Sequence, residues 1–174
     1  MQQKKTKIIL DADVIIHFVK AESFSLLPEI FPEYEYIILD VVYDEVAKDR
    51  RTKELIDNYT HYFSRIKRES FVPKGTVLKD YFQLLKTFGH GESACMIYCR
   101  EHRDVLGSSN LRDIKEYCRQ NDITFLTTID FLYYAFCRKI LSSQECDGFI
   151  RKVVAAGSKL PMVDIARYTC TAAV

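Results

Sequence analysis

Acidic residues stand at three places where apolar segments of the chain end or begin. Asp11 and Asp13 directly follow a short apolar run, Glu45 lies among valines, and Glu92 follows two glycines that flank a histidine. The carboxyl ends of strands in an open α/β sheet are where ligands and catalytic groups gather. Burying a carboxylate there costs free energy unless a positive partner satisfies it. These acids therefore indicate a shared positive partner.

A divalent metal ion is the partner that clustered carboxylates suit best. Mg²⁺ and Mn²⁺ prefer oxygen ligands. Mg²⁺ takes only one or two carboxylates directly and leaves positions for a phosphate oxygen and a water molecule. The predicted chemistry is hydrolysis of a phosphodiester.

Each acid also has an ordinary structural explanation. Asp13 is a favoured residue for capping a helix, and Glu92 in a first helical turn complements the helix dipole. Asp44 and Glu45 could lie on a solvated face, although the apolar neighbours point at least one of them inward. The metal hypothesis depends on whether the fold brings these acids together.

Short apolar runs alternate with longer amphipathic segments along the chain. The sequence predicts strands at 7–10, 36–39, 68–72, 105–107 and 123–126. It predicts helices at 14–20, 23–30, 42–49, 53–63, 77–88, 92–102, 111–121, 130–140, 144–156 and 163–168. This alternation is typical of βαβ units that build a parallel sheet with helices on both faces.

We therefore expect a single α/β domain with a doubly wound, mostly parallel, five-stranded sheet. The length of 174 residues is ample for one hydrophobic core. Residues 1–140 are predicted to form the domain, and residues 141–174 a helical extension of the same domain. In such a sheet, strand ends and helix starts meet in one crevice.

The chain resembles the PIN-domain family of metal-dependent ribonucleases, which includes the toxins of type II toxin–antitoxin pairs. Three ordered segments between about Lys7 and Ile140 carry this resemblance: Ile8-Ile9-Leu10-Asp11-Ala12-Asp13-Val14-Ile15-Ile16, Val41-Val42-Tyr43-Asp44-Glu45-Val46 and Gly89-His90-Gly91-Glu92-Ser93-Ala94. The resemblance implies a PIN-like fold. It also implies that Asp11, Glu45 and Glu92 are catalytic ligands of Mg²⁺ or Mn²⁺, which activates water for attack on an RNA phosphate.

The family's fourth acid normally follows the fourth strand, where this chain has Asn110. Asn110 offers a carbonyl oxygen without a charge, and Asp113 lies one helical turn further on, so either could be a metal ligand. As an alternative, this pair is typical of a helix N-cap with a supporting acid. Asp13 is predicted to support the site. Asp130, after the fifth strand, is a second supporting candidate and is equally an ordinary first-turn acid.

The net charge of +1 predicts no general affinity for nucleic acids. Local clusters of basic residues could still contact RNA phosphates, and the candidates are Arg50, Arg112 and Lys115. The alternative is that these residues belong to solvated helix faces. Arg112 is the strongest candidate because it adjoins the predicted site.

The sequence shows no secretory signal and no run of 18 apolar residues. The six cysteines contain no Cys-x-x-Cys pair, which indicates packed thiols in a reducing compartment. We therefore expect a cytoplasmic protein that does not enter a membrane.

Two classes of function fit these observations. The first is a PIN-type endoribonuclease, including a toxin that an antitoxin-type protein partner holds inactive. The second is a catalytically degenerate PIN-like module that binds RNA or a protein, because the fourth acid is replaced. By resemblance alone, two copies of the chain are expected to pair as a homodimer.

Overall fold

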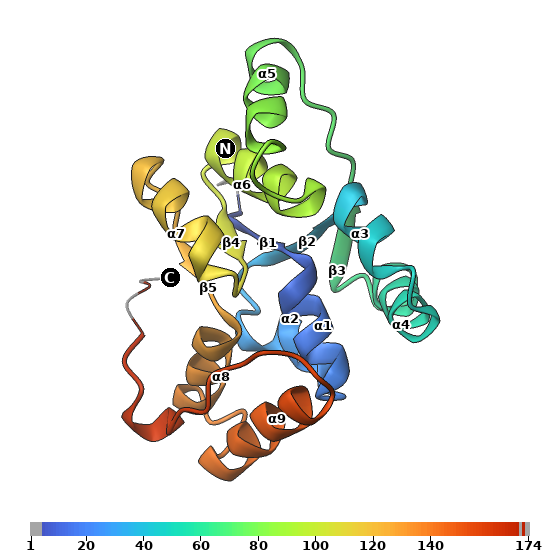
Figure 1. Cartoon of the computed structure of the whole chain (residues 1–174). Helices are drawn as coiled ribbons and strands as arrows, with labels where there is room; N and C mark the ends of the chain where they lie inside the picture. Colours follow the sequence, from blue (N-terminus) through green and yellow to red (C-terminus); the bar gives the residue numbers. More distant parts are fainter. Residues whose placement is uncertain (1–4, 171, 173–174) are drawn as a thin grey trace.

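A computed structural model describes residues 5–170 and 172 of the chain (Figure 1). The outermost residues of the predicted domain and of its extension therefore lie outside the described part. The strands are β1 (Lys7–Leu10), β2 (Glu35–Leu39), β3 (Ile66–Glu69), β4 (Val105–Gly107) and β5 (Phe125–Leu126). The helices are α1 (Ala12–Lys20), α2 (Leu27–Ile30), α3 (Asp40–Val46), α4 (Arg50–His61), α5 (Gly75–Leu84), α6 (His90–His102), α7 (Leu111–Gln120), α8 (Thr128–Cys137) and α9 (Ser143–Ala155), with 3₁₀ turns η1 (Phe24–Leu26) and η2 (Ile165–Arg167).

The five strands form one sheet in the order β3-β2-β1-β4-β5, and every pairing among the described strands is parallel. The chain moves outward from β1 through β2 to β3, then returns to β4 and β5 on the other side of β1. This is the doubly wound α/β fold that the sequence predicts. The winding direction reverses between β1 and β4, and in open α/β sheets ligands bind at this switch point.

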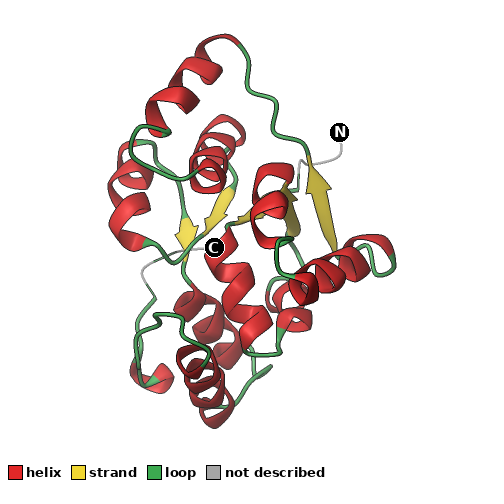
Figure 2. Ribbon diagram, turned by 45° about the vertical axis from the view of Figure 1, so that its right-hand side comes forward, coloured by secondary structure: helices red, strands yellow, loops and turns green. Residues whose placement is uncertain are grey.

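Helices cover both faces of the sheet. In Figure 1, α6 and α7 lie to one side of the strands, whereas α1, α2 and α8 lie to the other, and Figure 2 shows the same layers in a turned view. The two central strands β1 and β2 are almost wholly apolar and their residues Ile8–Leu10 and Ile37–Leu39 are fully buried. Continuous burial of this kind is typical of parallel strands that are covered on both faces.

The third strand was predicted at 68–72 and is found at Ile66–Glu69. Its only described neighbour is β2, whose last paired residue, Leu39, lies opposite Glu69. The chain beyond Glu69 therefore has no strand to pair with, and Pro73 has no N–H to donate to a ladder. Residues 70–74 consequently carry no regular structure.

Two predicted helices are also corrected. The segment 23–30 divides into η1 and the short α2, with Pro28 near the start of α2. The predicted helix 163–168 is reduced to the 3₁₀ turn η2, which begins after Asp164 caps the backbone N–H of Ala166. Its last predicted residue, Tyr168, instead donates a hydrogen bond to Asp130 of α8 at 2.7 Å.

The C-terminal extension packs into the same hydrophobic core as the sheet. Helix α9 buries four side chains, and the ring of Phe149 contacts that of Phe18 in α1 at a centroid distance of 4.8 Å. Farther along, Tyr134 of α8 donates a hydrogen bond to the carbonyl of Ala172 at 2.8 Å. The extension therefore covers α1 and α8 rather than standing apart from them.

The six cysteines are free, and four of them are buried. Among the residues that the structure describes, no helix combines the length and apolar content that crossing a membrane requires.

Candidate functional site

Asp11 lies at the switch point of the sheet. Its backbone N–H continues the parallel ladder by donating to the carbonyl of Gly107 at 2.8 Å. Its side chain caps α1, because Oδ1 accepts the N–H of Ala12 at 2.8 Å. The other oxygen, Oδ2, accepts the hydroxyl of Ser108 at 3.0 Å. Only 6 % of the residue is exposed, so Asp11 forms the floor of the site.

Asp13 was predicted to support the site, and capping of the first helix was the alternative role. The helix begins at Ala12 with Asp11 as its cap, so Asp13 lies inside the first turn. Asp13 Oδ1 accepts the N–H of Val14 at 2.6 Å, and Oδ2 accepts the N–H of Ser109 at 2.7 Å. The second bond joins the start of α1 to the loop after β4.

Glu45 reaches from α3 to the first turn of α6. Its Oε1 accepts the N–H of Gly91 at 2.9 Å. A Cβ atom at position 91 would lie 2.8 Å from Glu45 Oε2, so a side chain there would force the carboxylate of Glu45 to shift. Glycine at position 91 therefore lets this carboxylate lie against the start of α6.

Asn110 connects two further acids. Its Nδ2 donates to Glu92 Oε1 at 3.0 Å and to Asp113 Oδ2 at 2.7 Å. Asn110 does stand at the N-cap position of α7, but its side chain makes no capping hydrogen bond. In this arrangement it acts as a donor to two carboxylates, whereas the predicted role as a ligand would require its carbonyl oxygen.

The acids lower each other's tendency to ionise. Burial, reinforced by the negative charge of Asp13, raises the pKa of Asp11 to about 8. Burial also raises the pKa of Asp13. The pKa of Glu92 is raised to about 7 by burial and by the charges of Asp113, Asp13 and Glu45. These mutual influences mean that the five acids lie within electrostatic reach of one another.

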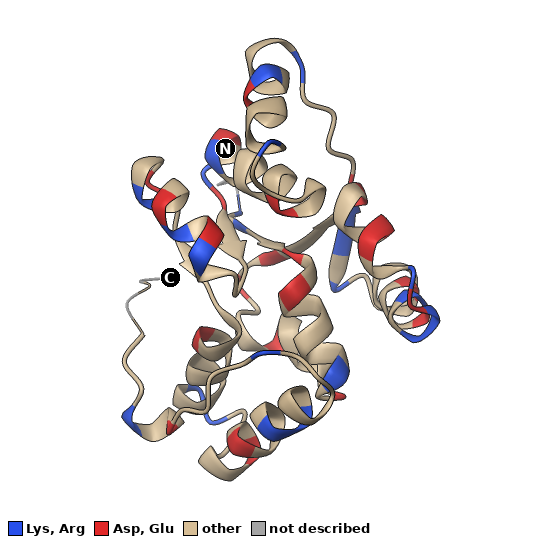
Figure 3. Cartoon of the chain, viewed as in Figure 1, with Lys and Arg blue, Asp and Glu red and all other residues tan. Residues whose placement is uncertain are grey.

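No positive side chain compensates these charges among the residues that the structure describes. None of the five acids takes part in a described ion pair. In Figure 3, acidic ribbon marks the starts of α1 and α6 near the centre of the view, and acidic and basic ribbon adjoin at the start of α7. Uncompensated carboxylates in a partly buried cluster suit a hard cation.

As the side chains stand, no three His, Cys, Asp or Glu residues of the described ranges are gathered tightly enough to hold a metal ion. Each acid is instead turned toward a hydrogen-bond donor: Ser108 for Asp11, Gly91 for Glu45 and Asn110 for Glu92. The donor set is all oxygen and the pKa values of three acids are raised, so the residues fit a divalent cation in chemistry. Binding one requires that carboxylates leave their present donors.

Two other predicted site residues, Asp130 and Arg50, have described side-chain partners outside this hydrogen-bonded cluster. Asp130 belongs to a capping box at the start of α8, where its Oδ2 accepts the N–H and hydroxyl of Thr127, while its Oδ1 accepts Tyr168. Arg50 is exposed and pairs with Glu54 at 2.8 Å.

Two further predicted basic residues lie on α7. Arg112 and Lys115 are exposed, and the first turn of the same helix carries Asp113. Neither takes part in a described ion pair.

The roles of Ser108 and Ser109 were not predicted from the sequence. Both serines donate hydrogen bonds to acids of the first segment. The sequence feature that could have indicated these roles is the position of both serines directly after β4. This strand lies beside β1 at the switch point.

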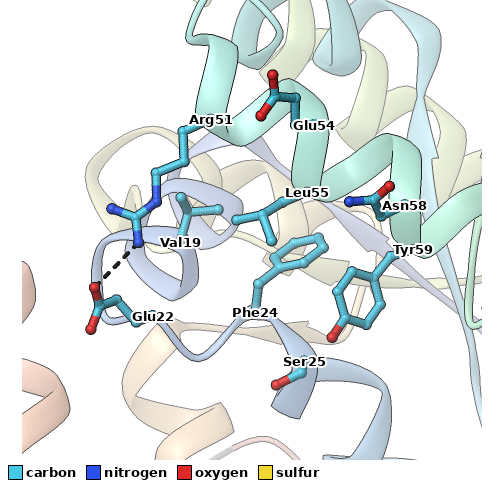
Figure 4. A pocket seen from close by; sticks show the side chains of 9 residues that line it. All are labelled: Val19, Glu22, Phe24, Ser25, Arg51, Glu54, Leu55, Asn58 and Tyr59. Atoms are coloured by element: carbon cyan, nitrogen blue, oxygen red, sulfur yellow. Dashed lines mark hydrogen bonds and ion pairs between the residues drawn. The ribbon is translucent and has the colours of Figure 1, made fainter.

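A separate cavity of about 320 Å³ opens between the end of α1, η1 and α4 (Figure 4). Phe24 and Tyr59 meet edge to face at its wall, with ring centroids 5.3 Å apart. An ion pair between Glu22 and Arg51 at 3.2 Å lies at its side. None of the predicted site residues lines this cavity, so it does not belong to the acidic site.

The fold and the acids together define an acidic site at the switch point of a parallel α/β sheet. No protein-family model and no curated protein matches the chain. A solved structure of VapBC-1 from nontypeable Haemophilus influenzae is similar in part, with 16 % sequence identity and a TM-score of 0.47. The alignment covers 70 % of this chain and 97 % of that chain. A likeness at this level carries no inference about activity.

Proposed function

We propose that this protein is a metal-dependent endoribonuclease of the PIN type. The observation that carries the proposal is the gathering of carboxylates from α1, α3, α6 and α7 at the switch point, with no described positive partner. Such a cluster is costly for folding unless a cation binds it. The sequence resemblance to PIN-domain ribonucleases supports the same function.

In this proposal, Asp11, Glu45 and Glu92 hold Mg²⁺ or Mn²⁺, and Asp113 supplies the negative charge that Asn110 lacks. Asp13 orients the loop after β4 by accepting the N–H of Ser109. The chemistry that such an ion supplies when bound is Lewis-acid activation of water and of the phosphate. The protein contributes the placement of the carboxylates and a wall that excludes bulk water from Asp11.

The proposed substrate is RNA, which would approach from the exposed side of α7. Asp11 is buried, whereas Asn110, Arg112 and Lys115 are exposed, so the site opens in their direction. Contacts from basic side chains to phosphates supply affinity that depends on salt and not on base sequence.

The test is cleavage of labelled single-stranded RNA in the presence of Mn²⁺. Wild-type protein is expected to cleave, whereas Asp11→Asn and Glu45→Gln are expected to lose at least about 100-fold in rate because each removes a ligand. Asp44→Asn is the matched control, since Asp44 is the exposed neighbour of Glu45. Absence of cleavage by wild type across several RNAs and metals would rule out the enzyme.

One observation favours a second function, that of a non-catalytic module that binds RNA or a protein. Asn110 replaces an acid and donates hydrogen bonds to Glu92 and Asp113, which reduces the charge available for a metal ion. This function predicts RNA binding without cleavage, and binding that Asp11→Asn does not weaken.

A toxin of a toxin–antitoxin pair is the narrower form of the proposed ribonuclease. It predicts that expression arrests growth and that Glu92→Gln relieves the arrest. It also predicts a protein partner of the antitoxin type, which would co-purify when both genes are expressed. Growth that continues while the wild-type protein accumulates would contradict the toxin function and leave the ribonuclease proposal intact.

A further inference from the structure

Three consecutive residues after β4 each donate a hydrogen bond to a different acid of the site. The hydroxyl of Ser108 donates to Asp11 at 3.0 Å, and the backbone N–H of Ser109 donates to Asp13 at 2.7 Å. The amide of Asn110 donates to Glu92 at 3.0 Å. These three hydrogen bonds position three carboxylates. We call residues 108–110 the acid-holding loop.

The acid-holding loop is itself anchored through the side chain of Ser109. Ser109 Oγ accepts the backbone N–H of Thr128 at 2.8 Å. It also lies 2.8 Å from the hydroxyl of Thr128. Thr128 is the first residue of α8 and is fully buried.

The series of hydrogen-bonded polar groups continues from Thr128 to a buried histidine, which we call the end of this polar chain. His17 Nδ1 lies 2.8 Å from Thr128 Oγ1, and only 6 % of His17 is exposed. Burial, with a smaller effect from the charge of Lys20, lowers the pKa of His17 to about 4. The ring is therefore neutral near pH 7, with one nitrogen that donates and one that accepts.

Two side-chain contacts link these residues, and a neutral ring allows each contact one donor and one acceptor. If the hydroxyl of Ser109 donates to Thr128, the hydroxyl of Thr128 donates to His17 Nδ1. If His17 Nδ1 carries the hydrogen, both contacts run in the opposite direction.

Local structure does not need this chain. Helix α8 is already capped by Thr127 and Asp130, which exchange both hydrogen bonds of a capping box. What the chain adds is a fixed position for Ser109.

We infer that His17 and Thr128 are positioning residues of the acidic site, which hold Ser109 and, through it, the acid-holding loop. This inference rests on the proposed metal-dependent function. The connection is specific: it joins α1, α8 and the loop after β4 beneath the carboxylates.

Two pairs of matched substitutions test the inference. His17→Leu and His17→Asn have similar volume, but only asparagine places a polar atom near the position of Nδ1. Thr128→Val removes the hydroxyl without changing the shape, whereas Thr128→Ser keeps it. The readouts are the Kd for Mn²⁺, from the spin-resonance signal of free Mn²⁺, and hydrogen exchange of the Ser109 amide in metal-free protein.

The leucine and valine variants are expected to weaken Mn²⁺ binding about tenfold and to speed exchange of the Ser109 amide. The asparagine and serine variants are expected to restore both values toward wild type. Phe149→Leu on α9 controls for a general loss of stability, and it is expected to leave both readouts unchanged. If His17→Leu does not fold, the comparison of Thr128→Val with Thr128→Ser tests the inference.

Equal Mn²⁺ affinity and equal Ser109 exchange in all four variants would overturn the inference. A wild-type protein that binds no Mn²⁺ would contradict the proposed function instead. Exchange of the Ser109 amide would then still report whether His17 and Thr128 hold the loop.

Discussion

At the scale of single residues, Glu45 and Gly91 make a contact that leaves no room for a side chain at position 91. The carboxylate accepts the N–H of Gly91 at 2.9 Å, and the space that a Cβ would need is already filled by its oxygens. The two glycines around His90 therefore differ in their surroundings. A Cβ at Gly91 would meet the carboxylate of Glu45, whereas a Cβ at Gly89 would meet nothing within 4 Å.

Gly91→Ala is expected to push Glu45 out of place. It should cost about 1 to 3 kcal/mol of stability through overpacking and weaken Mn²⁺ binding about tenfold or more. Gly148→Ala is the matched control, since it lies inside α9 with open space around it. That control should stabilise the protein by about 0.5 to 1 kcal/mol, and titration calorimetry with urea unfolding checks both. Unchanged Mn²⁺ affinity in Gly91→Ala would place Glu45 outside the metal site.

The raised pKa values of Asp11 and Glu92 predict how stability changes with pH. Both carboxyls bind protons more tightly in the folded protein than in the unfolded chain. The folded state therefore holds more protons between about pH 4 and pH 8, and the free energy of unfolding falls as the pH rises through this window. The effect concerns the metal-free protein, because a bound cation competes with the protons.

Asp11→Asn is expected to flatten this decline and to raise the free energy of unfolding at pH 8 by about 1 to 3 kcal/mol. This is less than the total for the whole pKa shift of Asp11, because each pKa unit corresponds to about 1.36 kcal/mol. Urea unfolding in EDTA at about pH 5 and pH 8 measures it. The exposed Asp44→Asn should keep the wild-type slope. Identical slopes for wild type and Asp11→Asn would mean that Asp11 is not buried as a charged group.

At the scale of elements, α8 joins the site to the C-terminal extension. One residue at its start, Thr128, contacts the acid-holding loop, whereas the capping acid Asp130 accepts the hydroxyl of Tyr168 at 2.7 Å. Asp130 thus connects the helix start to the segment after α9, which is a structural role different from the predicted support of the site.

Tyr168→Phe is expected to reduce the free energy of unfolding by about 1 to 2 kcal/mol, because it leaves one oxygen of Asp130 without its donor. Mn²⁺ affinity should stay within about twofold of wild type, since Thr127 still caps α8. Tyr62 is 81 % exposed. The control Tyr62→Phe should therefore change stability by less than about 0.5 kcal/mol. A large loss of Mn²⁺ affinity in Tyr168→Phe would restore Asp130 to the site.

At the scale of the whole molecule, the extension is part of the core that supports the sheet. Phe149 of α9 is buried against Phe18 of α1, which in turn meets Phe131 of α8 at 6.0 Å. Removing the extension would expose these rings of α1 and α8 to water.

Phe149→Ala is expected to cost about 3 to 5 kcal/mol, the range for emptying a large buried aromatic site. Phe82→Ala, on an exposed part of α5, should cost far less. Thermal and urea unfolding measure both. If Phe149→Ala were as stable as wild type, the extension would be an appendage that folds separately from the sheet.

Local sequence determined most of the strands and helices and the acids at their ends. The apolar run before Asp11 predicted a buried strand, and the winding order then brought Asp11 and the loop after β4 to the same switch point. The position of β3 was predicted wrongly because β3 ends where its partner strand β2 ends. The residues of β3 alone do not show that point. The predicted helix at 163–168 was wrong for a similar reason, because Tyr168 donates a hydrogen bond to Asp130 of α8.

Only the tertiary structure decided which partner each polar side chain takes. Sequence alone offered Asp13 as a cap of α1, and Asn110 as a ligand or a cap. In the fold, Asp11 caps the helix and Asn110 donates to Glu92 and Asp113. The reason is physical: periodicity fixes burial along one element, whereas hydrogen bonds between side chains depend on distances set by elements that are far apart in the chain.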